Sequence, residues 1–109
     1  MGSIKEKAYT KETIEFARVI KAIAHPARIM ILDYLFKKQE CVCGDFVNEL
    51  DLAQATISRH LNELKKVGLI KGTIEGRNVC YCINVSNYSR FRSKLHEVFG
   101  EVQINYQCC

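Results

Sequence analysis

Proline occurs once in this 109-residue chain, and long apolar runs do not occur at all. With one proline and 48% hydrophobic residues, the chain has no proline-rich linker, so we expect one compact, helix-rich domain over residues 1–109. No apolar stretch is long enough to cross a bilayer, and we expect no membrane partner. The first residues, MGSIKEKAY, lack the apolar run of a signal peptide, which predicts a cytoplasmic protein.

The motifs of common enzyme classes are also missing. The chain has no nucleotide-binding loop, no paired catalytic carboxylates and no Ser/His/Asp set. A thioredoxin-like enzyme needs a Cys-x-x-Cys pair at a helix start within a βαβ pattern, and neither feature occurs. The sequence therefore predicts a protein that is not an enzyme.

Cysteine, by contrast, is abundant, and its six residues form three close pairs. The pairs are Cys41 with Cys43, Cys80 with Cys82, and Cys108 with Cys109. Because thiols stay reduced in the cytosol, such pairs favour soft-metal binding or redox sensing over a disulfide framework.

Helical periodicity dominates the first two thirds of the chain. Apolar residues recur at helical spacing over residues 11–24, and Pro26 opens a second helix that is apolar nearly all round and should be central. Two short helices with a tight turn then fill residues 45–67, which predicts a helix-turn-helix ending at Gly68. On or near the outer side of its second helix lie side chains that can read base edges: Gln54, Thr56, Ser58, Arg59 and Asn62.

Residues 69–84 show strand alternation on both sides of a turn at 75–78, which predicts a hairpin with Arg77 at its tip. A helix-turn-helix followed by a basic hairpin makes a winged helix, a mainly α fold with a small β hairpin. We expect its recognition helix to enter the major groove of double-stranded DNA, with Lys71 and Arg77 reaching phosphate or the minor groove.

These segments resemble the ArsR/SmtB family of metal-responsive bacterial repressors. The resemblance runs from about Phe16 to Ile83 and is carried by AIAHPARIMILDYL, CVCGDFVNEL, LAQATISRHLNELKKVGLI and EGRNVCYCI. It implies a homodimeric winged-helix repressor that releases operator DNA when an inducer binds. Ala53 departs from the family, in which a serine often caps the recognition helix at this position; losing such a cap costs on the order of 1 kcal/mol.

An apolar stripe over residues 86–100 predicts a dimer interface. Its members recur in steps of three and four, as in helices that pack along a partner helix: Tyr88, Phe91, Leu95 and Val98. Because family dimers use both terminal helices, residues 11–24 with Phe16 are assigned to the same interface. The alternative is that the stripe packs only on the first helix of its own domain.

The histidines do not form the family's zinc site on the last helix, because His96 with Glu97 supplies too few ligands. We expect His25 to cap the helix that Pro26 opens, and His60 to pack beside the apolar face of the recognition helix or contact phosphate.

Arsenic and cadmium sensors of the family carry cysteines in a pattern like CVCDLC, but here CVCGDFV displaces both thiols by one residue. The site must therefore be derived from geometry. If residues 40–43 pair with the returning wing strand, Val42 and Tyr81 face the core. Four thiols then share the opposite face: Cys41, Cys43, Cys80 and Cys82.

Four thiols in one area suit a trigonal As(III) or Sb(III) site, or a tetrahedral Zn(II) or Cd(II) site. The sequence thus predicts an arsenic-sensing repressor, with Cys108 and Cys109 as a secondary candidate site. Alternatives remain open: unrelated half-buried cysteines, a thiol redox-sensing repressor, or a DNA-binding protein with a purely structural zinc.

Overall fold

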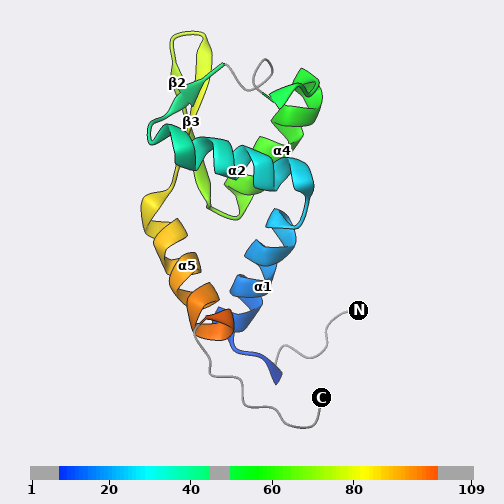
Figure 1. Cartoon of the computed structure of the whole chain (residues 1–109), viewed down its shortest axis with the longest axis vertical. Helices are drawn as coiled ribbons and strands as arrows, with labels where there is room; N and C mark the ends of the chain where they lie inside the picture. The colour runs from blue at the N-terminus through cyan, green and yellow to red at the C-terminus, as the bar shows by residue number, and fades with distance from the viewer. Residues whose placement is uncertain (1–7, 45–49, 101–109) are drawn as a thin grey trace.

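A computed structural model describes residues 8–44 and 50–100 of the chain (Figure 1). Four helices and one antiparallel three-stranded sheet of order β1-β3-β2 occupy these residues. The helices are α1 (Lys11–Ile23), α2 (Pro26–Lys38), α4 (Gln54–Lys66) and α5 (Val85–Phe99), and the strands are β1 (Val42–Cys43), β2 (Ile70–Glu75) and β3 (Asn78–Ile83). The predicted mainly α fold is confirmed, and β1 extends the predicted hairpin to three strands. Residues 45–49, where the helix-turn-helix should begin, lie outside the described residues.

Local capping explains where three of the four described helices begin. Thr10 accepts a hydrogen bond from the backbone N–H of Thr13 at the start of α1, and Asn84 does the same for Asn87 at the start of α5. His25 Nδ1 accepts from the backbone N–H of Ala27 at 3.0 Å, which confirms the predicted cap of α2. Ala53, the residue before α4, provides no capping side chain, as the sequence predicts.

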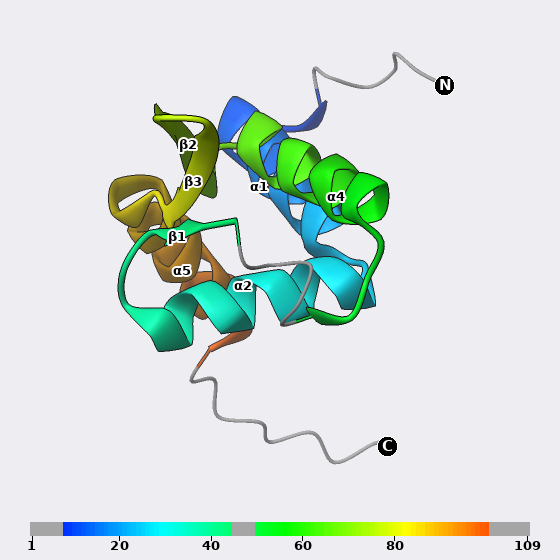
Figure 2. The same cartoon turned by 90° about the horizontal axis from the view of Figure 1, so that it is seen from above.

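The core forms where α2 and α4 pack against the base of the sheet. The fully buried side chains Ile31 and Leu35 of α2 meet Ile57 and Leu64 of α4 in one apolar cluster, which Ile70 of β2 completes. Burial of whole aliphatic side chains at about 1.5–3 kcal/mol each makes this cluster the main stabilising element. The prediction that the second helix is central holds for its inner face only: α2 runs along one side of the molecule (Figure 2), and its Ile29 and Met30 remain 53% and 40% exposed.

The recognition helix passes directly into the wing through a Schellman motif. Gly68, at φ 80°, donates its N–H to Lys65 O at 3.0 Å, and Leu69 donates to Leu64 O at 3.2 Å. Glycine suits this left-handed position, which confirms Gly68 as the predicted helix stop. The motif joins α4 directly to β2 without a flexible linker.

The two terminal helices, α1 and α5, lie side by side at the end of the molecule opposite the wing (Figure 1). Their contact includes Phe16 against Phe91, with ring centroids 5.5 Å apart, and an ion pair between Lys94 Nζ and Glu12 Oε1 at 3.3 Å. None of the helices in the described part of the chain is long and apolar enough to span a membrane.

Candidate functional site

The outer face of α4 is polar and its inner face is buried. Ile57, Leu61 and Leu64 point into the core, while Gln54, Arg59 and Asn62 are exposed. Thr56 and Ser58 are half-buried at the border between the two faces. A shallow hollow in the surface runs along the exposed side; its lining includes Ser58, Arg59, Asn62, Lys65 and Lys66. The polar side chains predicted from the sequence therefore lie on one accessible helix face.

A buried histidine anchors this helix to α2. His60 is 2% exposed, and its Nδ1 accepts a hydrogen bond from Arg28 Nε at 3.0 Å. The same guanidinium donates to the Ala22 carbonyl at the end of α1 at 2.9 Å, and the ring of His25 lies 4.4 Å from that of His60. Of the two roles predicted for His60, the structure supports packing, because the side chain is enclosed.

Burial lowers the pKa of His60, and electrostatic interactions with His25, Arg28 and Arg59 lower that pKa further. A neutral imidazole leaves Nδ1 free to accept from Arg28, so the lowered pKa and the hydrogen bond require the same protonation state.

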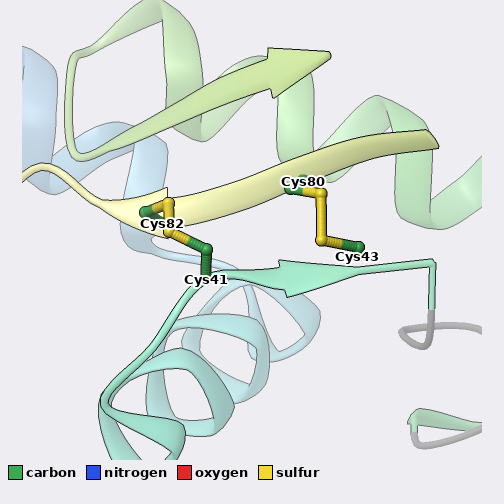
Figure 3. The surroundings of a disulfide bond; sticks show 4 residues. All are labelled: Cys41, Cys43, Cys80 and Cys82. Carbon is green, nitrogen blue, oxygen red and sulfur yellow. A yellow bond between two sulfur atoms is a disulfide. The ribbon is translucent and has the colours of Figure 1, made fainter. Parts of the chain in front are cut away.

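The four strand cysteines come together across β1 and β3 (Figure 3). Val42 lies opposite Tyr81 and Cys43 opposite Cys80 in the antiparallel register, so the alternation predicted from the sequence places the thiols on one face. Two disulfides join them, Cys41 to Cys82 and Cys43 to Cys80, with Cα–Cα distances of 4.4 and 4.0 Å. Such spacings are typical of non-hydrogen-bonded antiparallel pairs, whose side chains approach most closely.

Two features of this group differ from the expectation. The sequence favoured free thiols, whereas the structure holds the four cysteines as disulfides. Cys80 is also fully buried rather than turned to solvent, because β3 is the central strand and Cys43 and Thr73 flank it on either side. Cys41, at the edge of the sheet, is exposed.

Glu75 is a neighbour of the cysteines that was not predicted from the sequence. Its carboxylate and the sulfurs of Cys43 and Cys80 all lie within 4.8 Å of one another, and no other described group of three such donors is this close. The pairing of Thr73 with Cys80 puts odd-numbered β2 residues on the thiol face. Strand alternation with the correct register could therefore have identified Glu75.

The remaining predicted residues lie at three places. Lys71 is exposed opposite Cys82 on the thiol face, and Arg77 is exposed in the turn of the wing. Tyr88 packs on Phe36 of its own chain at 4.5 Å between ring centroids. Leu95 and Val98 remain 37% and 46% exposed on α5. Cys108 and Cys109 lie outside the described residues.

Comparison with known proteins identifies the family. Residues 25–71 match the model of the arsR family of bacterial regulatory proteins. The HTH-type transcriptional regulator CmtR of Mycobacterium tuberculosis is 34% identical over 92 residues, which cover 84% of this chain and 77% of CmtR. The chain belongs to the ArsR family. It is therefore a DNA-binding transcriptional regulator and not an enzyme, in agreement with the prediction.

Two further similarities extend this assignment. The cadmium resistance transcriptional regulatory protein CadC of Lactococcus lactis is 35% identical over 80 residues, 72% of this chain and 66% of CadC. The solved structure of an ArsR-like transcriptional regulator from Rhodococcus sp. RHA1 aligns with a TM-score of 0.70 at 22% identity and covers 82% of this chain and 83% of that chain. This structural match confirms the winged-helix fold of the ArsR-family protein.

Stability should fall in mild acid because of His60. The folded-state pKa lies below the ordinary value of 6.5, so as the pH falls below 6.5 the unfolded chain takes up a proton that buried His60 does not. The free energy of unfolding should therefore be constant above this pH and fall below it, by at most about 1.4 kcal/mol per pH unit. Urea denaturation of the wild type and His60→Asn between about pH 7.5 and 5.5 measures this slope. His60→Asn should flatten it, while His96→Asn, at an exposed position on α5, should not; equal slopes in all three proteins would contradict the assignment.

Proposed function

We propose that this ArsR-family protein is a homodimeric repressor that leaves its operator when As(III) or Sb(III) binds thiolates drawn from Cys41, Cys43, Cys80 and Cys82. The observation that carries the proposal is the β1–β3 register, which gathers the four sulfurs on one face of the wing. Soft thiolate ligands select thiophilic ions, and no other described group of side chains offers several sulfurs.

The DNA interface proposed here consists of α4 and the wing. Gln54, Thr56, Ser58, Arg59 and Asn62 would contact bases and phosphates in the major groove, and Lys71 and Arg77 would contact the backbone or the minor groove. Two observations support this arrangement. The side chains of Arg59, Asn62 and Arg77 are exposed, and α4 and the wing lie at the same end of the molecule (Figure 1).

A short covalent and hydrogen-bonded path connects the sensor to this interface. β3 carries two of the cysteines and pairs along its whole length with β2, which follows α4 through Gly68 and Leu69. A change in the spacing of β1 and β3 would therefore re-orient the wing relative to the recognition helix. Couplings of this type amount to roughly 1–3 kcal/mol, enough for a 5- to 150-fold change in affinity.

Thiol oxidation is a second candidate signal, because both cysteine pairs are within bonding distance in the structure. An oxidant would convert the two dithiols to two disulfides without any metal. Cd(II) and Zn(II) are further candidate inducers; the name of CadC connects that relative with cadmium resistance. A purely structural zinc would leave DNA affinity unchanged on metal loading.

The proposed dimer interface uses the part of α5 that its own chain leaves uncovered. Phe16, Tyr88 and Phe91 make ring contacts within their own chain. They would therefore hold α5 in position for the interface, beneath the residues that contact the partner. Leu95 and Val98, exposed and seven and ten residues after Tyr88, would contact the partner helix directly.

Arg59→Ala should lower specific operator affinity by about 1–3 kcal/mol if Arg59 reads a base. Arg77→Ala should weaken binding to all sequences and reduce the slope of log K against log salt by about one, since it would contact phosphate. Fluorescence anisotropy with operator and scrambled duplexes at several salt concentrations measures both. Arg92→Ala removes the same charge from α5, which is not part of the proposed DNA interface, and serves as the control. Normal operator binding by folded Arg59→Ala protein would remove this residue from the interface.

Leu95→Glu or Val98→Glu should convert the dimer to a monomer, because a buried unpaired charge costs several kcal/mol. Sedimentation velocity measures the assembly state, and palindromic operator binding should be lost with it. Ser93→Glu places the same charge on another face of α5 and should leave the dimer intact. A dimer that survives both Leu95→Glu and Val98→Glu would locate the interface elsewhere.

Each strand pair should be needed for the inducer response. Cys41→Ser with Cys43→Ser, or Cys80→Ser with Cys82→Ser, should give a repressor that binds DNA but is no longer released by As(III). Anisotropy titrations in reducing buffer measure release, and circular dichroism verifies folding, since Cys80 is buried. The proposal is wrong if both double variants respond normally while Cys108→Ser with Cys109→Ser alone abolishes the response.

A further inference from the structure

The three strands of the sheet each contribute one donor atom to the same small volume. Cys43 comes from β1, Cys80 from the central strand β3 and Glu75 from the end of β2. Cys43 lies directly opposite Cys80, whereas Glu75 is diagonal to it, two residues beyond the paired Thr73. Diagonal neighbours are about 7–8 Å apart at Cα, a distance that a long glutamate side chain can span.

We propose that reduced Cys43 and Cys80, together with Glu75, form a binding site for a borderline divalent cation, Zn(II) or Cd(II). The site shares two cysteines with the inducer site proposed above but does not depend on a response to As(III). Two thiolates and a carboxylate are an ordinary ligand set for a tetrahedral Zn(II) ion that keeps a fourth position for water. As(III), in contrast, prefers three sulfurs and would not use Glu75.

The arrangement of the three donor atoms is close to what such an ion requires. With metal–sulfur distances of about 2.3 Å and metal–oxygen distances of about 2.0–2.2 Å, neighbouring donors in a tetrahedron are about 3.6–3.8 Å apart. In the structure the two sulfurs are joined as a disulfide and the Glu75 carboxylate lies within 4.8 Å of both, so after reduction the sulfurs must separate to the tetrahedral spacing and the carboxylate must move closer. Glu75 is exposed, which leaves a path for the ion to enter.

Oxidation and metal binding exclude each other at this site. A dithiol reductant must first transfer two electrons and two protons to the Cys43–Cys80 disulfide, becoming a disulfide itself and leaving two protein thiols. The cation then replaces the two thiol protons, which are released to solvent. The oxidised protein therefore lacks the site, and the metal-loaded protein protects these thiols from oxidation.

Metal binding at this site would cross-link β1, the shortest strand, to the two strands of the wing. β1 is two residues long, and a metal bridge would join it to both hairpin strands at once. Glu75 immediately precedes the turn that carries Gly76 and Arg77. The site would thus restrain the turn that the proposed DNA interface uses.

Titration of the reduced full-length protein with Cd(II), in competition with a chelator, tests the site through the thiolate-to-metal absorption band. We expect about one Cd(II) ion to bind per protein chain. Co(II) should give the spectrum of a tetrahedral two-thiolate complex. Glu75→Gln should lower Cd(II) affinity about tenfold or more, because even the outer partners of metal ligands contribute about 10- to 100-fold. Protein oxidised with a disulfide-forming reagent should not bind.

Two matched variants make the result specific. Glu40→Gln removes another exposed carboxylate that is outside the donor group, and it should bind like the wild type. Cys41→Ser with Cys82→Ser keeps all three donors and should also bind. Absence of binding by the wild type or by this double variant, or equal affinity in Glu75→Gln, overturns the site. Protein that binds Cd(II) through Glu75 but keeps its operator in As(III) overturns the proposed inducer and supports the site.

Discussion

The antiparallel pairing of the two-residue strand β1 with β3 is the constraint on which the chemistry of this protein depends. A slip of β1 by one residue would turn Val42 to the thiol face and Cys41 and Cys43 toward the core, so that these two cysteines could no longer meet Cys80 and Cys82. The buried side chain of Val42, 6% exposed, holds the register from the core side. The disulfides and the Glu75 donor group are consequences of that register on the other face.

A second constraint fixes the recognition helix. Arg28 links the end of α1, the start of α2 and His60 of α4 through directed hydrogen bonds, so α4 cannot rotate without breaking a buried polar contact. Such a contact is expensive to break, because an unpaired buried donor or acceptor costs about 1–3 kcal/mol. Movement within the proposed DNA interface is therefore easier at the wing than in α4. Cys80 and Cys82 lie on the wing and Cys41 and Cys43 beside it, where a modest free energy of inducer binding would produce the largest displacement.

The family relationship and the cysteine positions carry different information. Similar folds persist at 22% identity because packing tolerates substitution between apolar residues of similar size. A metal or redox site depends instead on a few side chains at one location, so it can differ between members that share the whole scaffold. For this reason the fold follows from the family, whereas the inducer is argued from the sulfurs and carboxylate present in this chain.

Helical and strand periodicities in the sequence determined the order and nearly the bounds of α1, α2, α4, α5 and the wing, because each pattern reflects a face that must be buried. The caps at His25 and Gly68 were also predictable, since both act within a few residues. Strand parity predicted that Cys41, Cys43, Cys80 and Cys82 share a face. Only the tertiary structure decided that Cys80 is enclosed, that Tyr88 and Phe91 pack within their own chain, and that Glu75 joins the thiols. The first two features depend on which strand is central and on contacts between residues far apart in the chain, which a local sequence pattern does not contain. The third needs the β2–β3 register together with the position of β1 beside β3, and only the folded sheet combines the two.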